Sequence, residues 1–112
     1  MPMMFGFGVQ RKQMLEAELE RLVEEMPRLG MTQMYLVGDF AKGKVGTDTM
    51  LNLLVVQKTD VAKHRRADFW TTHLRPRVGT ELFVFTSGEF DSTNESDPML
   101  REAAAFGDRI YG

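Results

Sequence analysis

The chain has 112 residues, of which 43% are hydrophobic and 27% are charged, and these values are ordinary for one globular domain spanning residues 1–112. The formal net charge of −2 excludes a global positive field that would recruit nucleic acid or an anionic membrane. The absence of cysteine excludes disulfides, thiol catalysis and cysteine-ligated zinc, and it fits the reducing cytoplasm.

The N-terminal third predicts a loose segment, a helix and a strand. Residues 1–9 form a loose lead-in, because Gly6 and Gly8 interrupt it. Residues 10–29 form an amphipathic helix that Gly30 ends, with its apolar face running to Leu29. We expect its acidic residues on a solvated surface: Glu16, Glu18, Glu20, Glu24 and Glu25. A near-continuous apolar run then predicts a buried strand over 31–37.

The rest of the chain alternates in the same way, and no apolar run exceeds strand length, so we expect no membrane span. The remaining elements are a glycine-containing loop over 38–48, a strand over 50–57, a helix over 60–75, a strand over 81–86, a loop over 87–97 with one helical turn near Glu89, and a helix over 97–106. This order predicts an α/β (α+β) fold, with one small mixed β-sheet and helices packed mainly on one face.

The segment 35–56, YLVGDFAKGKVGTDTMLNLLVV, carries a family pattern. Its strand, glycine turn, loop and second strand resemble the signature of the DNA polymerase beta-like nucleotidyltransferases in their smallest stand-alone form. Gly38 ends the first strand, and the family's aromatic, alanine, basic and glycine positions follow as Phe40, Ala41, Lys42 and Gly43. The strand ELFVFT and the tail DPMLREAAAFGDRIYG resemble later parts of the same family, so the likeness covers nearly the whole chain.

The resemblance implies a reaction that moves a nucleotidyl group from a nucleoside triphosphate to a hydroxyl, with Mg²⁺ held by three carboxylates. Two of these carboxylates form Asp-x-Asp, because alternate residues of a strand point to one face. The resemblance places the nucleotide-binding loop at Gly38, Asp39, Lys42 and Gly43.

The family's three carboxylate positions are Met50, Asn52 and Glu81 in this chain, so the sequence departs from the family at the first two and keeps an acid only at the third. A thioether is a poor ligand for Mg²⁺, and an amide offers only a neutral oxygen. Asp39 stands where the family has serine, and its charge repels a triphosphate. We therefore expect no catalytic residues, no bound metal and no cofactor. The alternative is a weakened enzyme that holds Mg²⁺ with Asp39, Asp48 and Glu81; their simpler interpretations are a helix cap, a turn residue and a strand-edge residue.

Other candidates have simpler structural interpretations. His64 and His73 lie nine positions apart, which matches no zinc motif, so we expect surface histidines. Trp70 is expected in the core. The densest basic group is expected to be a solvated helix face, with a phosphate- or acid-binding surface as the alternative: Lys63, His64, Arg65, Arg66, Arg75 and Arg77.

The resemblance also implies a partner. Stand-alone domains of this kind often act as the antitoxin beside a small helical HEPN-type protein. We therefore expect a catalytically inactive partner-binding module, with exposed methionines and the acidic first helix as contact face, or self-association. Binding to membranes or nucleic acid is not expected.

Overall fold

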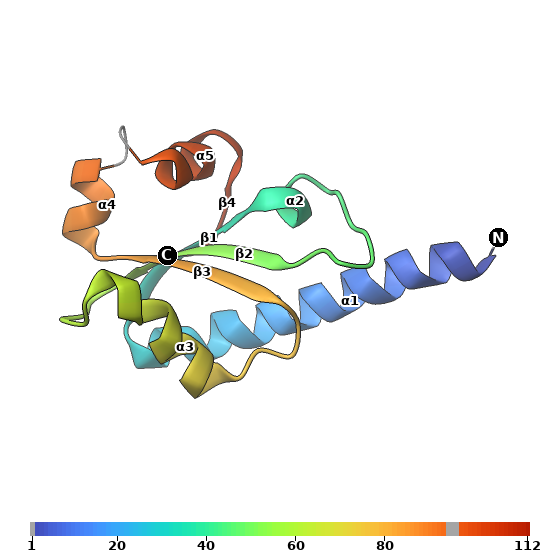
Figure 1. Cartoon of the computed structure of the whole chain (residues 1–112), viewed down its shortest axis with the longest axis horizontal. Helices are drawn as coiled ribbons and strands as arrows, with labels where there is room; N and C mark the ends of the chain where they lie inside the picture. Colours follow the sequence, from blue (N-terminus) through green and yellow to red (C-terminus); the bar gives the residue numbers. More distant parts are fainter. Residues whose placement is uncertain (1, 94–96) are drawn as a thin grey trace.

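The computed structural model describes residues 2–93 and 97–112. Figure 1 shows its elements, which in chain order are α1 (Pro2–Glu25), β1 (Met31–Val37), α2 (Gly38–Ala41), β2 (Leu51–Gln57), α3 (Arg66–Leu74), β3 (Thr80–Phe85), α4 (Ser87–Thr93), α5 (Pro98–Phe106) and β4 (Asp108–Tyr111). Two short 3₁₀ helices, Met26–Leu29 and Lys63–Arg65, lead into β1 and α3.

The four strands form one mixed sheet in the order β3-β2-β1-β4. β1 is antiparallel to both β2 and β4, whereas β2 and β3 are parallel. The expected neighbours are confirmed: β1 pairs with β2 from Met31 opposite Gln57 to Val37 opposite Asn52. Gly38 follows the last residue of β1, and Asn52 is the second residue of β2, as the sequence predicts.

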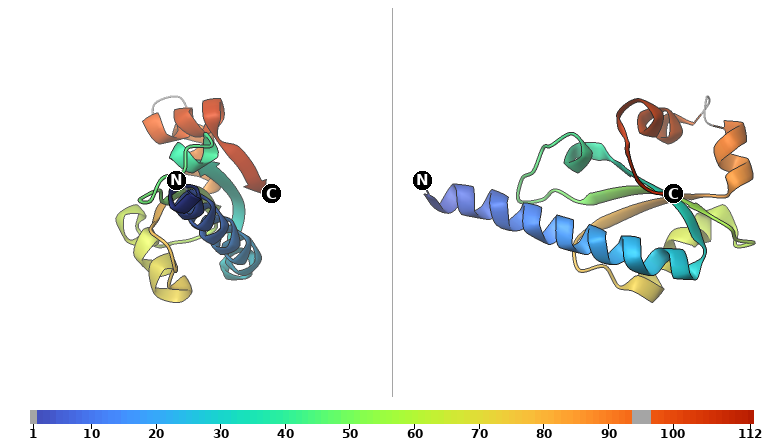
Figure 2. Two further views of the ribbon diagram at one scale, coloured as in Figure 1. Left: turned by 90° about the vertical axis from the view of Figure 1, so that its right-hand side faces the viewer. Right: turned by 180° about the vertical axis from the view of Figure 1, so that it is seen from behind.

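Helices cover both faces of the sheet (Figure 2). Leu53 and Val55 of β2 belong to the larger buried cluster, with side chains from α1 and α3, and the neighbouring Leu54 and Val56 belong to a second cluster with α5. We expected helices mainly on one face; the larger cluster does lie under α1 and α3, but α4 and α5 cover the other face. The reason is the sequence of β2. Its consecutive residues Leu53 to Val56 are all apolar, so apolar side chains point to both faces of the sheet and both faces need to be covered.

The first helix begins earlier than expected, because the backbone of residues 2–9, which we expected as a loose lead-in, is helical from Pro2. Proline suits a first turn, where no backbone N–H is needed. Figures 1 and 2 show that this part of α1 runs past the end of the sheet. At the other end, Pro27 falls in a 3₁₀ helix, Gly30 adopts φ 108° and Leu29 is 38% exposed instead of buried.

Two further elements differ from expectation. The helix expected over 60–75 begins only at Arg66, after a 3₁₀ turn. α4 spans seven residues where we expected one turn, and its start is a capping box. The Glu89 carboxylate accepts a hydrogen bond from the Thr86 N–H at 2.8 Å, and the Thr86 hydroxyl accepts one from the Glu89 N–H at 3.2 Å.

No helix in residues 2–93 or 97–112 has both the length and the apolar character needed to span a membrane.

Candidate functional site

The family's carboxylate positions meet at one end of the sheet. Val37, the last residue of β1, is paired with Asn52 of β2, and Asn52 is in register with Glu81 of β3. By strand alternation, Asn52 and Glu81 share the face of Phe83, on the side of α4 and α5. The sequence therefore predicted which strands bring these positions together.

The Asn52 side chain lies against the glycine turn. Gly38 adopts φ 78°, and a Cβ atom added there would overlap the Asn52 amide, with the Asn52 Cγ at 3.0 Å. Only glycine fits this turn, since it needs both a left-handed backbone and the absence of a side chain. The half-buried amide thus occupies the space directly above the turn.

Met50 is also packed against backbone. A Cβ atom added at Gly79, in the loop before β3, would lie 3.0 Å from the Met50 Cγ and 3.5 Å from its sulfur. The amide of Leu51, the next residue, donates to the Gly79 carbonyl at 2.9 Å. The Met50 side chain therefore packs on Gly79, between the start of β2 and the start of β3.

The loop after β1 holds the residues assigned to nucleotide binding. The Lys42 ammonium lies 3.4 Å from the Glu102 carboxylate of α5 and 5.3 Å from the centre of the Phe106 ring. The exposed Asp39 lies in the first turn of α2 without a side-chain capping bond, so its interpretation as a cap is wrong. Gly43 has φ 78°, and a Cβ atom there would meet nothing within 4 Å.

The alternative metal set is not brought together. Asp39 and Asp48 line one hollow of about 590 Å³, with Asp48 in a turn, but Glu81 does not line it. In residues 2–93 and 97–112, no group of three or more histidine, cysteine or acidic side chains could hold a metal ion. At the family's own positions, a thioether, a neutral amide and a single carboxylate do not fit Mg²⁺, which requires hard oxygen ligands.

The other candidates have structural roles. The buried Trp70 is in the core as expected, and its Nε1–H donates to the Gln57 amide oxygen at 3.1 Å. His64 and His73 are exposed, as expected. His73 Nδ1 lies 2.7 Å from the Phe69 carbonyl oxygen.

The basic group is not one solvated face. Arg66 is only 6% exposed, and its guanidinium pairs with Glu89 at 2.5 Å and donates to the Val61 carbonyl at 2.8 Å. The hydrogen bond from Arg66 is the main cause that lowers the pKa of the Glu89 carboxyl below its ordinary value. The Lys63 ammonium lies 4.3 Å from the centre of the Phe85 ring.

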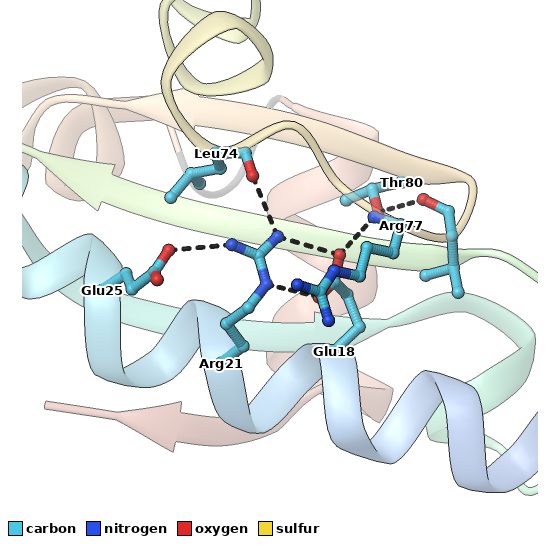
Figure 3. Close-up of polar contacts among 7 residues, drawn as sticks. Glu18, Arg21, Glu25, Leu74, Arg77 and Thr80 are labelled. Carbon is cyan, nitrogen blue, oxygen red and sulfur yellow. Dashed lines mark hydrogen bonds and ion pairs between the residues drawn. The ribbon is translucent and has the colours of Figure 1, made fainter.

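Sequence reasoning missed a polar network between α1 and the segment before β3 (Figure 3). Glu18 was expected on a solvated surface, yet it is 4% exposed and accepts hydrogen bonds from the Arg21 guanidinium at 2.7 Å and from the Arg77 backbone N–H. Arg21 also pairs with Glu25 at 2.9 Å and donates to the Leu74 carbonyl at 2.9 Å. The spacing of these three charges, at i, i+3 and i+7, was the available signal.

The network stabilises the charged forms of both Glu18 and Arg21. The hydrogen bond from Arg21 is the largest influence on Glu18 and lowers the pKa of its carboxyl, against a smaller opposing effect of burial. The same bond raises the pKa of the Arg21 guanidinium. Both groups are therefore held in their charged forms.

A second missed contact ties α1 to the loop before β2. The Arg11 guanidinium donates two hydrogen bonds to the Thr49 carbonyl, at 3.0 and 2.6 Å. The two residues are 38 positions apart in the chain, and no local pattern predicts such a contact.

No family model and no curated protein matches the chain. Several solved structures are similar over most of it. A toxin–antitoxin crystal structure with AMP-PNP is 14% identical over 87% of this chain and 73% of that chain, with a TM-score of 0.50. A Sulfolobus solfataricus protein assigned as a nucleotidyltransferase is 16% identical over 78% of this chain and 77% of that chain, also with a TM-score of 0.50. Together with the mixed four-stranded sheet, these similarities show that the chain has a nucleotidyltransferase-like fold.

Proposed function

We propose that this chain is a catalytically inactive nucleotidyltransferase-fold protein that binds a partner protein, as an antitoxin does. The observation that carries the proposal is the sheet end where Asn52 is in register with Glu81, because Glu81 is the single carboxylate among the three family positions, Met50, Asn52 and Glu81. The proposal includes a cytoplasmic location and no need for metal or nucleotide.

The chemistry of this sheet end supports inactivity. Mg²⁺ carries two positive charges that several oxygen anions normally offset, and Met50 and Asn52 supply none. Asp39 adds a negative charge beside the loop, and Lys42 is already paired with Glu102. A triphosphate would therefore lack the metal, and the basic residue at the family's loop position is already engaged by a carboxylate.

The likeness to known proteins supports a partner. The solved structure that shares this fold over 87% of the chain is of a toxin–antitoxin pair. The family pattern in residues 35–56 implies the same kind of arrangement, with a small helical HEPN-type protein as toxin. A domain that keeps the fold but has only one of the three carboxylates suits a role in which binding, and not transfer, is the function.

The first part of the proposal, catalytic inactivity, is tested by calorimetry with MgCl₂ and ATP, followed by a transfer assay with radiolabelled ATP. We expect no saturable heat and no labelled protein. Magnesium-dependent labelling that disappears in Glu81→Gln would contradict inactivity.

The second part of the proposal, binding of a partner as an antitoxin, is tested in cells by co-expressing the chain with a HEPN-type protein encoded beside its gene. We expect co-purification as a complex and recovery of growth that the HEPN-type protein alone prevents. A chain with no such neighbour, or a neighbour whose toxicity the chain leaves unchanged, would refute the antitoxin role.

A further inference from the structure

We propose that the groove along α1, bordered by Gln10, Met14, Ala17 and Arg21, is a docking site for an amphipathic helix of a partner protein that carries acidic side chains beside its apolar stripe. This inference rests on the proposed function, because it assigns the surface and the chemistry of the partner contact.

The groove consists of two hollows that share Met14. One, of about 310 Å³, lies between Gln10, Arg11 and Met14 of α1 and Thr47 of the loop before β2. The other, of about 220 Å³, continues along the helix and is lined by Met14, Ala17, Glu18, Arg21, Arg77 and Val78. The α1 positions 10, 14, 17 and 21 are spaced by four, three and four residues, so they form one stripe along the helix.

The shape of the stripe suits a helix. Met14 is 50% exposed, and its flexible thioether adapts to different apolar surfaces. Ala17 is exposed and small, which allows a second helix axis to approach closely. The tie from Arg11 to Thr49 and the network around Glu18 hold both walls of the groove in place.

The arginine side chains that line the two hollows favour a partner with acidic side chains. The Arg11 guanidinium binds a neutral carbonyl, so its charge is not offset there. Among the described residues, the exposed Arg77 guanidinium lies within ion-pair distance of no carboxylate, although its charge is close enough to Glu18 to help lower the pKa of that carboxyl. The bond to Glu18 comes from the Arg77 backbone N–H (Figure 3). Glu18 is buried between Arg21 and Arg77 and cannot meet a ligand, whereas Arg77 is exposed. Arg11 and Arg77 are therefore the charged groups that the groove offers to an acidic side chain.

Two synthetic amphipathic peptides of about 18 residues, roughly five helical turns, provide the probe. They share a leucine and alanine stripe and differ only in having glutamate or lysine on the flanks. We expect the glutamate peptide to bind and the lysine peptide to bind at least about tenfold more weakly.

Matched variants locate the site. Arg77→Gln should weaken binding of the glutamate peptide, and Arg75→Gln, an exposed arginine outside both hollows, should not. Ala17→Trp should block the groove, and Ala104→Trp, at an exposed alanine of α5, should leave binding unchanged. Circular dichroism melts confirm that each variant is folded.

Equal binding of both peptides, equal effects of the two arginine changes, or no binding at all would overturn the inference. So would a dimer of the chain alone, seen by sedimentation velocity and abolished by Ala17→Trp, because the occupant would then be a second copy. The proposed function is tested separately, since neither the ATP assays nor the toxicity assay involves the groove variants.

Discussion

Glu18 and Glu20 lie two positions apart on α1, yet among the described residues only Glu18 has hydrogen-bonding partners for its side chain. Glu18 is buried and accepts hydrogen bonds from Arg21 and Arg77, whereas Glu20 is exposed. A carboxylate that is paired and almost fully buried contributes to stability only while it is ionised, and its removal leaves Arg21 short of a partner. A surface carboxylate contributes little in either state.

This contrast predicts a pH dependence of folding stability. The folded-state pKa of Glu18 is lowered from 4.5, so its contribution is present above that pH and is lost as the pH falls through the folded pKa. Glu18→Gln should lower the free energy of unfolding by about 2 kcal/mol at neutral pH, and it should reduce the acid-induced loss of stability below pH 4.5. Glu89 has a lowered pKa too, so part of the loss remains.

Urea denaturation at a series of pH values measures the effect. Glu20→Gln is the matched control, and its unfolding curve should follow that of the parent chain at each pH. If Glu18→Gln and Glu20→Gln lose stability equally, the network does not hold Glu18 in its charged form.

At the scale of elements, the strands β1, β2 and β3 were predicted within one residue at each end, whereas β4 was given no predicted range. Among the helices, α5 begins within one residue of its predicted start, but α1 and α3 do not. β1 and β2 are apolar in unbroken runs, and a buried sheet is the simplest way to satisfy such a run. α4 was taken for a single turn because its sequence SGEFDST lacks apolar periodicity. Its stability comes instead from the capping box of Thr86 and Glu89 and from the buried Arg66, which is 23 positions from Glu89 in the chain.

The start of α4 gives a second prediction. Thr86→Val should cost about 1 kcal/mol, because it removes one capping bond from a partly exposed helix start. Glu89→Gln should cost more, since it also leaves the nearly buried Arg66 guanidinium without its carboxylate. Thermal melts of both variants give the comparison; equal losses would mean that the ion pair adds nothing to the capping box.

The tie between α1 and the loop before β2 gives a third prediction. Arg11→Met keeps the length of the side chain but removes both hydrogen bonds to the Thr49 carbonyl. The amides of the loop should then exchange with solvent faster, with a loss of stability of about 1 kcal/mol. Hydrogen exchange by mass spectrometry measures this. Lys12→Met, at the exposed neighbouring position, should leave the loop amides at the parent rate, and faster exchange in both would argue against a specific tie.

At the scale of the whole molecule, the nucleotidyltransferase-like fold is present, while Met50 and Asn52 occupy two of the positions that the family resemblance assigns to carboxylates. The strand pairing that brings Asn52 beside Glu81 was predictable from the glycine turn and the two strands that flank it. The packing of Met50 on Gly79 and of Asn52 on Gly38 was not, because side-chain contacts between strand ends depend on the folded loops. These contacts show what now fills a place where the family resemblance implies carboxylates.

Restoring the carboxylates tests whether the framework alone still makes a metal site. In the triple variant Met50→Asp, Asn52→Asp, Asp39→Ser, both new acids lie at alternate positions entering β2, with Glu81 in register on β3. Three carboxylates at one sheet end repel one another, and position 50 is half-buried against Gly79. The variant should therefore unfold at a lower temperature than the parent when no divalent cation is present.

Adding MgCl₂ should reverse that loss, because the ion binds only the folded state; at 100 times its dissociation constant it stabilises by about 2.7 kcal/mol. Thermal melts of parent and variant across a MgCl₂ series measure the effect, with KCl of equal ionic strength as the control for screening. The parent should show the same melting temperature in both salts. If the variant also melts alike in both, the packing around Met50 and Asn52 has closed the site beyond the loss of its carboxylates, and the domain would need changes in its loops as well before it could hold a metal.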